Sequence, residues 1–174
     1  YTSGWFANSD GFGNEPTPNV LAVMRPPDAE GVGYYLLAEV DGPGALTRTW
    51  TTHPWPIDGY LRVLIDGNDE PLYFGPADRF MHDRLAAFGA DGVTSAGYTQ
   101  YDACYLPIPF SRGLRIEWIG KLSVPHFYHI QVRSYDAGTV VRSFTPEDLT
   151  TWRAQLLETQ RRLFNPQPAG DPLA

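Results

Sequence analysis

Hydrophobic and polar residues alternate along the middle of the chain, in short runs separated by glycine-containing turns. This period of two residues predicts β-strands that bury one face and expose the other. Eight short strands within about 110 residues are typical of a β-sandwich. The runs cover residues 33–40, 45–52, 60–66, 71–74, 103–109, 114–119, 126–135 and 139–143.

Two segments repeat their apolar residues at helical spacing instead. Residues 78–88 predict a short helix inside a loop, which Gly89 ends. Residues 146–164 predict a longer helix, because Thr145 and Pro146 are typical of a helix start. We expect this helix to pack across one sheet with Trp152 buried, so that Trp152→Ala destabilises the domain.

The strand after the turn at 41–44 places an arginine and a tryptophan on one face. The turn Asp-Gly-Pro-Gly predicts glycine conformations that are costly for other residues. Regular alternation puts Arg48 beside Trp50, and we favour the interpretation that this face is the core, where Arg48 needs a carboxylate or a place at the rim. The alternative is a surface that binds a sugar or another subunit. Candidate carboxylates are Glu39, Asp66 and Asp78.

Composition limits the class of protein. The 174 residues suit one domain, and the hydrophobic fraction of 43% is too high for a disordered chain. The 17 glycines and 16 prolines indicate many turns and few long helices, so we expect an all-β fold. A net charge of −7 with scattered basic residues argues against a nucleic-acid partner. No apolar run is long enough for a membrane span.

The chain divides into four parts. We expect an extended N-terminal arm at 1–20, a sandwich at 21–144, a helix packed on it at 145–165, and a tail or linker at 166–174. The first residue is Tyr1 rather than methionine, so we expect a chain that is processed, excised or given without its start, and export is allowed. We therefore expect an extracellular or cell-surface location.

Few residues in the sequence are placed to bind a metal or a cofactor. The single cysteine, Cys104, lies in a strand-like run and is expected to be a small buried hydrophobe. The four histidines are spread widely, and His126 and His129 point to opposite faces of one strand. The acidic residues at 66–70 lack the spacing of a calcium loop. We expect neither a metal nor a cofactor.

Five motifs follow one another along the chain: G-W-F-A-N at 4–8, D-G-P-G-A at 41–45, R-V-L-I-D-G at 62–67, Y-L-P-I-P-F at 105–110 and Y-H-I-Q-V-R at 128–133. In this order they resemble the N-terminal half of the family once called domain of unknown function 2961, now glycoside hydrolase family 172. The resemblance implies a jelly-roll sandwich, oligomeric assembly, and relatives that cleave α-linked furanosides of fructose or arabinose.

The resemblance also implies that this half lacks the catalytic groups. Retaining glycosidases use two carboxylates roughly 5 Å apart, and in the family these belong to the second jelly roll. When the two halves are overlaid, Ala77 stands where a catalytic glutamate would be. Asp58 stands near the other acidic motif, and we interpret it as a turn residue.

Two hypotheses about function remain open. The first is a non-catalytic jelly-roll subunit that forms a homo-oligomeric ring, filament or shell, with carbohydrate as a further partner. The second is the first half of an active furanosidase. Candidate contacts for carbohydrate or a subunit are Arg48, Trp50, Trp55, Tyr98 and Tyr101, and candidates for an assembly arm are Trp5, Phe6 and Phe12.

Overall fold

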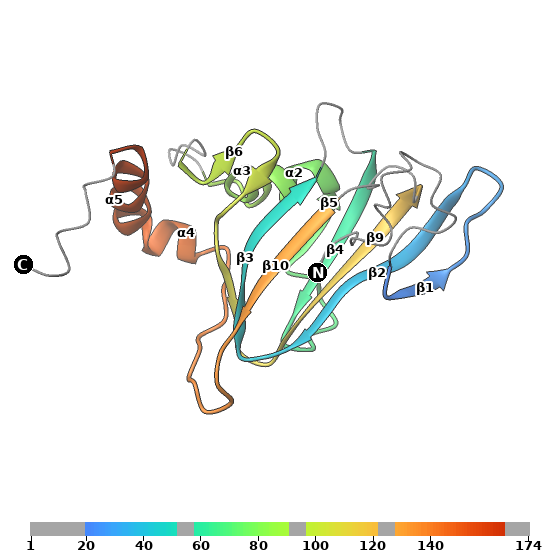
Figure 1. Ribbon diagram of the computed structural model, residues 1–174, viewed down its shortest axis with the longest axis horizontal. Helices are drawn as coiled ribbons and strands as arrows, with labels where there is room; N and C mark the ends of the chain where they lie inside the picture. Colours follow the sequence, from blue (N-terminus) through green and yellow to red (C-terminus); the bar gives the residue numbers. More distant parts are fainter. Residues whose placement is uncertain (1–19, 52–57, 91–96, 122–127, 166–174) are drawn as a thin grey trace, which may run out of the picture.

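In the part of the chain that the structure describes, ten strands form two antiparallel sheets that pack face to face as a β-sandwich (Figure 1). The computed structural model describes residues 20–51, 58–90, 97–121 and 128–165. The prediction of an all-β sandwich with a short helix in a loop and a C-terminal helix is confirmed. Both sheets pair strands that are distant in the sequence, as jelly-roll connections do.

The first sheet has the order β1-β2-β9-β4-β5, and the second has the order β10-β3-β7-β6, with β8 also paired to β3. The first comprises β1 (Ala22–Arg25), β2 (Val32–Asp41), β9 (Gly113–Lys121), β4 (Gly59–Ile65) and β5 (Tyr73–Pro76). The second comprises β10 (Tyr128–Ser134), β3 (Gly44–Thr51), β7 (Ala103–Cys104), β6 (Thr99–Gln100) and β8 (Ile108–Phe110).

The core lies between the inner faces of the two sheets, where apolar side chains from alternate positions are buried. Helices α2 (Ala77–His82) and α3 (Arg84–Ala87) add to it, because α2 contacts strands of both sheets. These helices replace the single helix expected at 78–88. The break falls at Asp83, whose carboxylate accepts a hydrogen bond from the Ala86 amide at 3.0 Å and so starts a new helix.

A β-bulge in β3 overturns the expected facing of its side chains. Gln131 of β10 pairs with Arg48, but the next residue, Val132, pairs with Leu46, so Thr47 is an extra residue in β3. The bulge reverses the alternation: Leu46 points into the core, but after it Thr49 is the buried residue. Arg48 and Trp50 therefore lie on the outer face of the second sheet. Our favoured interpretation, with both in the core face, is wrong.

The turn at 41–44 needs its glycines for a different reason from the one expected. Neither Gly42 nor Gly44 has a positive φ. A Cβ at Gly42 would lie 2.8 Å from the backbone of Arg112, and one at Gly44 would lie 2.7 Å from the Phe110 ring. Close approach of neighbouring segments, rather than backbone conformation, excludes larger residues here.

The predicted strand at 139–143 is absent, and this segment is irregular. Two helices follow it, α4 (Asp148–Thr151) and α5 (Arg153–Phe164), with Trp152 between them.

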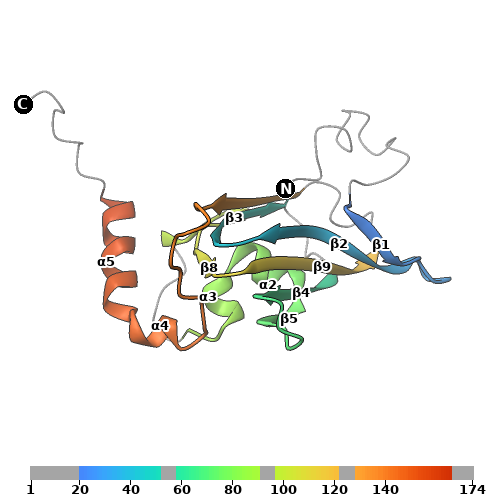
Figure 2. The same ribbon diagram turned by 90° about the horizontal axis from the view of Figure 1, so that it is seen from below.

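The C-terminal helix does not lie across a sheet. Figures 1 and 2 both show α5 beside the sandwich, away from the faces of the two sheets. Leu149 of α4 is buried, with 4% of its surface exposed, whereas Trp152 is 47% exposed and no residue of α5 is fully buried. The Tyr98 hydroxyl donates to the Leu156 carbonyl at 2.7 Å and ties α5 to the domain. The expected burial of Trp152 is wrong.

Candidate functional site

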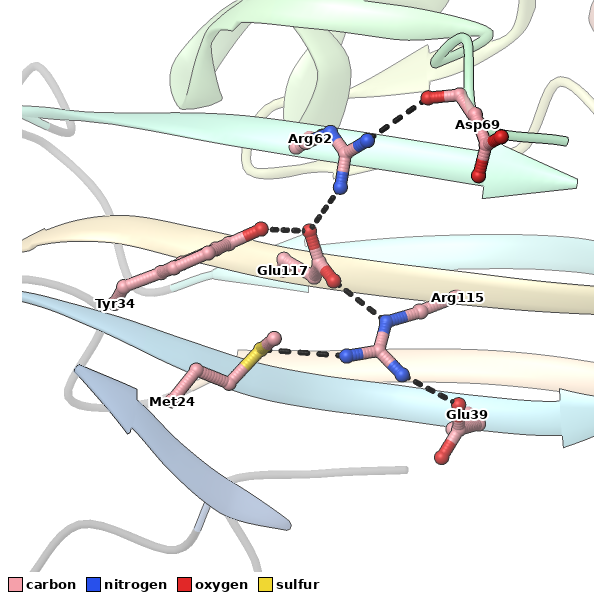
Figure 3. Close-up of polar contacts among 7 residues, drawn as sticks. All are labelled: Met24, Tyr34, Glu39, Arg62, Asp69, Arg115 and Glu117. Atoms are coloured by element: carbon pink, nitrogen blue, oxygen red, sulfur yellow. Dashed lines mark hydrogen bonds and ion pairs between the residues drawn. The ribbon is translucent and has the colours of Figure 1, made fainter. Parts of the chain in front are cut away.

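A buried carboxylate, Glu117, stands at the centre of the outer face of the first sheet (Figure 3). Only 1% of its side chain is exposed. Arg115 Nε donates to Glu117 Oε1 at 2.5 Å, and Arg62 Nη1 donates to Oε2 at 3.1 Å. The Tyr34 hydroxyl also donates to Oε2. Three strands contribute side chains to this cluster: Tyr34 lies on β2, Glu117 on β9 and Arg62 on β4. Arg62 reaches Glu117 because the two residues pair directly across the neighbouring strands.

The two arginines extend this cluster across the sheet. Arg115 donates to Glu39 Oε1 at 2.7 Å and contacts Met24 Sδ at 3.3 Å. Arg62 donates to the Asp69 carbonyl at 2.9 Å. Positive and negative groups thus alternate in one row from β2 to the turn after β4 (Figure 3).

The electrostatics of Glu117 suit a permanently ionised group. Burial alone would raise its pKa, but hydrogen bonds from Tyr34, Arg115 and Arg62 outweigh burial, so the pKa is lowered. The same carboxylate raises the pKa of Arg115 through its hydrogen bond. Burial, followed by the hydrogen bond to Glu117, raises the pKa of Tyr34. Glu117 is therefore an anchor for two cations and is not a proton donor at neutral pH.

A cavity of about 640 Å³ lies over this row, and we call it the outer groove. Its base includes Arg62, Arg115 and Glu117, and its apolar lining includes Met24 and Leu64. The volume falls within the range of small-ligand sites, roughly 300–1,000 Å³.

A second cluster occupies the outer face of the second sheet. The Trp50 and His129 rings lie with centroids 4.8 Å apart. Arg48 donates from Nε to the Tyr105 hydroxyl at 3.3 Å and from Nη1 to His129 Nδ1 at 3.4 Å. Burial, together with the charge of Arg48, lowers the pKa of His129, which favours the neutral ring. In the neutral tautomer that carries its proton on Nε2, Nδ1 accepts this bond.

The remaining predicted contact residues are not brought together. Tyr101 is 80% exposed in the turn between β6 and β7, close in sequence to the second cluster. Tyr98 is only 4% exposed and holds α5, so a role in surface contact is wrong for it. Trp55 lies outside the residues that the structure describes, as do the three arm residues Trp5, Phe6 and Phe12.

The other polar residues singled out from the sequence have structural positions. The Asp66 carboxylate accepts hydrogen bonds from the amides of Ser111 (2.9 Å) and Arg112 (2.6 Å) and from the Ser143 hydroxyl. It thereby ties three segments together. Cys104 is buried, as expected. No group of three or more potential metal ligands occurs within residues 20–51, 58–90, 97–121 and 128–165. Ala77 is fully buried at the start of α2.

Sequence reasoning missed two features. Arg84 is fully buried between α3 and the second sheet, and it donates to the carbonyls of Leu106 and Cys104. Nothing in the local pattern marks this role. The row of Arg115 and Glu117 could have been found, because both occupy alternate positions between apolar residues of one strand. Their partner Arg62 required the register between strands.

These observations define a β-sandwich module with a distinct polar cluster on each outer face. The chain belongs to the family described as GH172 first beta-sandwich domain, whose sequence profile matches residues 1–151. The resemblance to the N-terminal half of glycoside hydrolase family 172 is thus confirmed. A comparison with curated proteins found no significant match. None of the helices in the described segments has the length and apolar character to cross a membrane.

Proposed function

We propose that this chain is a non-catalytic β-sandwich subunit of the family and that it acts by assembly with further copies of itself. The observation that supports this most directly is the outward position of Arg48 and Trp50, beside His129 and Tyr105, on the outer face of the second sheet. Tryptophan, tyrosine and arginine are the side chains enriched at the energetic centres of protein interfaces. The cluster lies on the face of a sheet, which suits a broad protein partner.

The carboxylates support a non-catalytic role. A glycosidase needs an acid whose pKa is raised, together with a second carboxyl group roughly 5–9 Å away. Each Asp or Glu with a shifted pKa in the described segments is shifted downward. Glu117 and Asp66 are the fully buried acidic residues of the described segments, and both are bound by protein donors. Asp78 is half-buried, and its Oδ1 atom is buried without a hydrogen-bond partner among the described residues.

The test of assembly is the oligomeric mass of the purified chain and of two tryptophan variants. We expect an oligomer by light scattering, and we expect Trp50→Ala to weaken association by about 2 kcal/mol or more, roughly 30-fold. Trp152→Ala is the matched control, because Trp152 is also partly exposed but lies between α4 and α5. A monomeric native chain, or an equal loss in both variants, would refute the assembly role.

A second candidate function is support of an active glycosidase as its first domain. The family description favours it, since a first β-sandwich belongs to a glycoside hydrolase family. Both candidates predict that the purified chain alone does not hydrolyse arabinofuranosides or fructofuranosides, so the oligomeric mass of the native chain is the measurement that separates them. Turnover by this chain alone would contradict the non-catalytic role.

A further inference from the structure

We propose that the outer face of the first sheet docks against the outer face of the second sheet of another copy of this chain. This docking depends on the proposed assembly, and it supplies the surface that receives the cluster of Arg48 and Trp50. The core lies between the two sheets, so their outer faces lie on opposite sides of the sandwich (Figure 2). Copies therefore associate head to tail, through two different surfaces, as in a ring or a filament.

The outer face of the first sheet carries a patch of aromatic and apolar side chains. One row crosses β2, β9, β4 and β5 in register, and its members are Tyr34, Ile119, Tyr60 and Pro76. Phe74 lies beside this row, with its ring centroid 6.0 Å from that of Tyr60. We call these five residues the aromatic patch. Tyr60 is 50% exposed and Phe74 is 60% exposed, and apolar groups gathered on the outside of a sheet are typical of a protein interface.

The two outer faces carry charges of opposite sign. The described strands of the second sheet contain no aspartate or glutamate, and they contribute the cations Arg48 and Arg133. The first sheet bears the outer groove, whose five carboxylates and three guanidinium groups leave a formal charge of −2. Glu39 in this groove has a side chain that is 54% exposed, and a carboxylate can accept more than the one bond from Arg115. Opposite potentials favour the docking of one face on the other.

The aromatic and charged groups are spaced alike on the two faces. On the second sheet, Trp50 pairs with His129, and Arg133 follows four residues later on β10. On the first sheet, Glu39 pairs with the residue of β9 that lies four positions before Ile119 of the aromatic patch. Figure 3 shows Tyr34 of the same patch and Glu39 toward opposite ends of β2. Each interval of four residues spans about 13 Å along a strand. One orientation therefore places Trp50 on the patch and Arg133 beside Glu39.

A two-fold contact of either face with itself fits these observations less well. Pairing of the second-sheet face with its own copy would bring Arg48 and Arg133 of both chains together, with no carboxylate from the strands of that sheet. Like charges brought together in an interface weaken association. Pairing of the aromatic patch with itself would leave Trp50 outside the interface. The charges and the rings are both matched when the two different faces meet.

The test mixes two variants that each carry one damaged face. Trp50→Ala damages the second-sheet face, and Phe74→Lys places a cation in the aromatic patch. Alone, each variant should associate about ten-fold or more weakly than the native chain, because every contact then includes a damaged face. An equimolar mixture should form a heterodimer with near-native affinity, because the undamaged face of one variant meets the undamaged face of the other. Light scattering should show that growth stops at this heterodimer.

A charge exchange tests the contact between Arg133 and Glu39. Arg133→Glu and Glu39→Arg should each weaken association several-fold, because each places two like charges opposite one another. The double variant, which carries both substitutions, should regain most of the native affinity. A structural role of Glu39 toward Arg115 alone would give no such recovery.

A matched control and a second patch variant accompany these measurements. Leu163→Lys is the control for Phe74→Lys, because Leu163 is 55% exposed and lies on α5, outside both sheet faces. Its association should equal that of the native chain. Circular dichroism shows whether each variant keeps the fold, and Tyr60→Lys, at the other exposed ring of the patch, takes the place of Phe74→Lys if that variant unfolds.

The outcomes separate this docking from the proposed assembly. A monomeric native chain would overturn both. A native oligomer that Trp50→Ala weakens, but that Phe74→Lys leaves unchanged or weakens no more than Leu163→Lys does, would overturn the docking alone. A mixture of the two damaged variants that stays monomeric would also overturn it, because the intact faces would then have met without binding.

Discussion

Replacement of Arg84 tests how a buried cation without an acidic partner stabilises this fold. Arg84 is 0% exposed, and no carboxylate in the described segments pairs with it. Its guanidinium donates to the Leu106 carbonyl at 2.6 and 2.9 Å, to the Cys104 carbonyl at 3.0 Å and to the Thr49 hydroxyl. These bonds join α3 to strands of the second sheet. Burial lowers the pKa of Arg84.

The expected change in the free energy of unfolding can be worked from the acceptors that lose the Arg84 donor in Arg84→Met. Three buried acceptors lose their partner, at a cost of about 1–3 kcal/mol each. Removal of a desolvated charge offsets several kcal/mol of this. We therefore expect a net loss of about 3 kcal/mol in the free energy of unfolding. For a domain of this size that corresponds to about 6–12 °C in the melting temperature.

Urea unfolding, followed by tryptophan fluorescence to which buried Trp118 contributes, measures this loss. The matched control is Arg162→Met, because that arginine is 75% exposed and its one ion pair among the described residues is with Glu158 on the same helix. We expect no measurable change in the control. If Arg84→Met were as stable as the native chain, desolvation would outweigh the hydrogen bonds and the reasoning would be refuted.

Three further predictions concern other residues. Asp66→Asn should cost about 2 kcal/mol at pH 7, because Asn tolerates the positive φ of 60° but lacks the charge. Burial would raise the pKa of Asp66, but hydrogen bonds from Ser143 and backbone amides lower it overall. Its stabilisation is thus complete above the ordinary value of 3.8 and is lost as pH falls through the lower folded value, so the native chain and the variant should converge in acid urea titrations. Trp152→Ala should cost about 1 kcal/mol or less, against about 2–4 kcal/mol for Leu149→Ala, in the same urea assay; equal losses would contradict the exposure of Trp152. Tyr98→Phe should remove about 1 kcal/mol from the attachment of α5, and unchanged hydrogen exchange of the α5 amides would contradict it.

Much of the fold could be predicted because strand formation depends on local alternation. The runs around Leu61, Ile116 and Ile130 each present one apolar face, and in the structure these residues are buried. The segment at 139–143 shows the limit of this reasoning. It has apolar residues, yet it does not pair with a neighbour, and Val140 is 98% exposed.

The helical prediction at 78–88 was correct in type and place apart from the break at Asp83, whereas the C-terminal helix was correct in type and wrong in where it packs. The sequence predicted a helix start at Thr145 and Pro146, but α4 begins at Asp148 with Glu147 as its N-cap. The Thr145 amide nevertheless donates to the Asp148 carboxylate at 2.9 Å, as in a capping box. The amphipathic stripe then predicted a sheet beneath Trp152. Which surface a stripe faces depends on the path of the chain before the helix, and no local pattern encodes that path.

The sequence by itself determined the β-sandwich and the family, because both depend on short patterns that neighbouring residues carry. Only the tertiary structure decided which polar side chains meet. One extra residue at Thr47 turns Arg48 and Trp50 outward, since each step in a strand reverses the facing of its side chain. The register of three strands brings Glu117 to Arg62 and Tyr34. Contacts of this kind depend on which distant strands pair and in which register. The alternation of apolar and polar residues along one strand does not determine either.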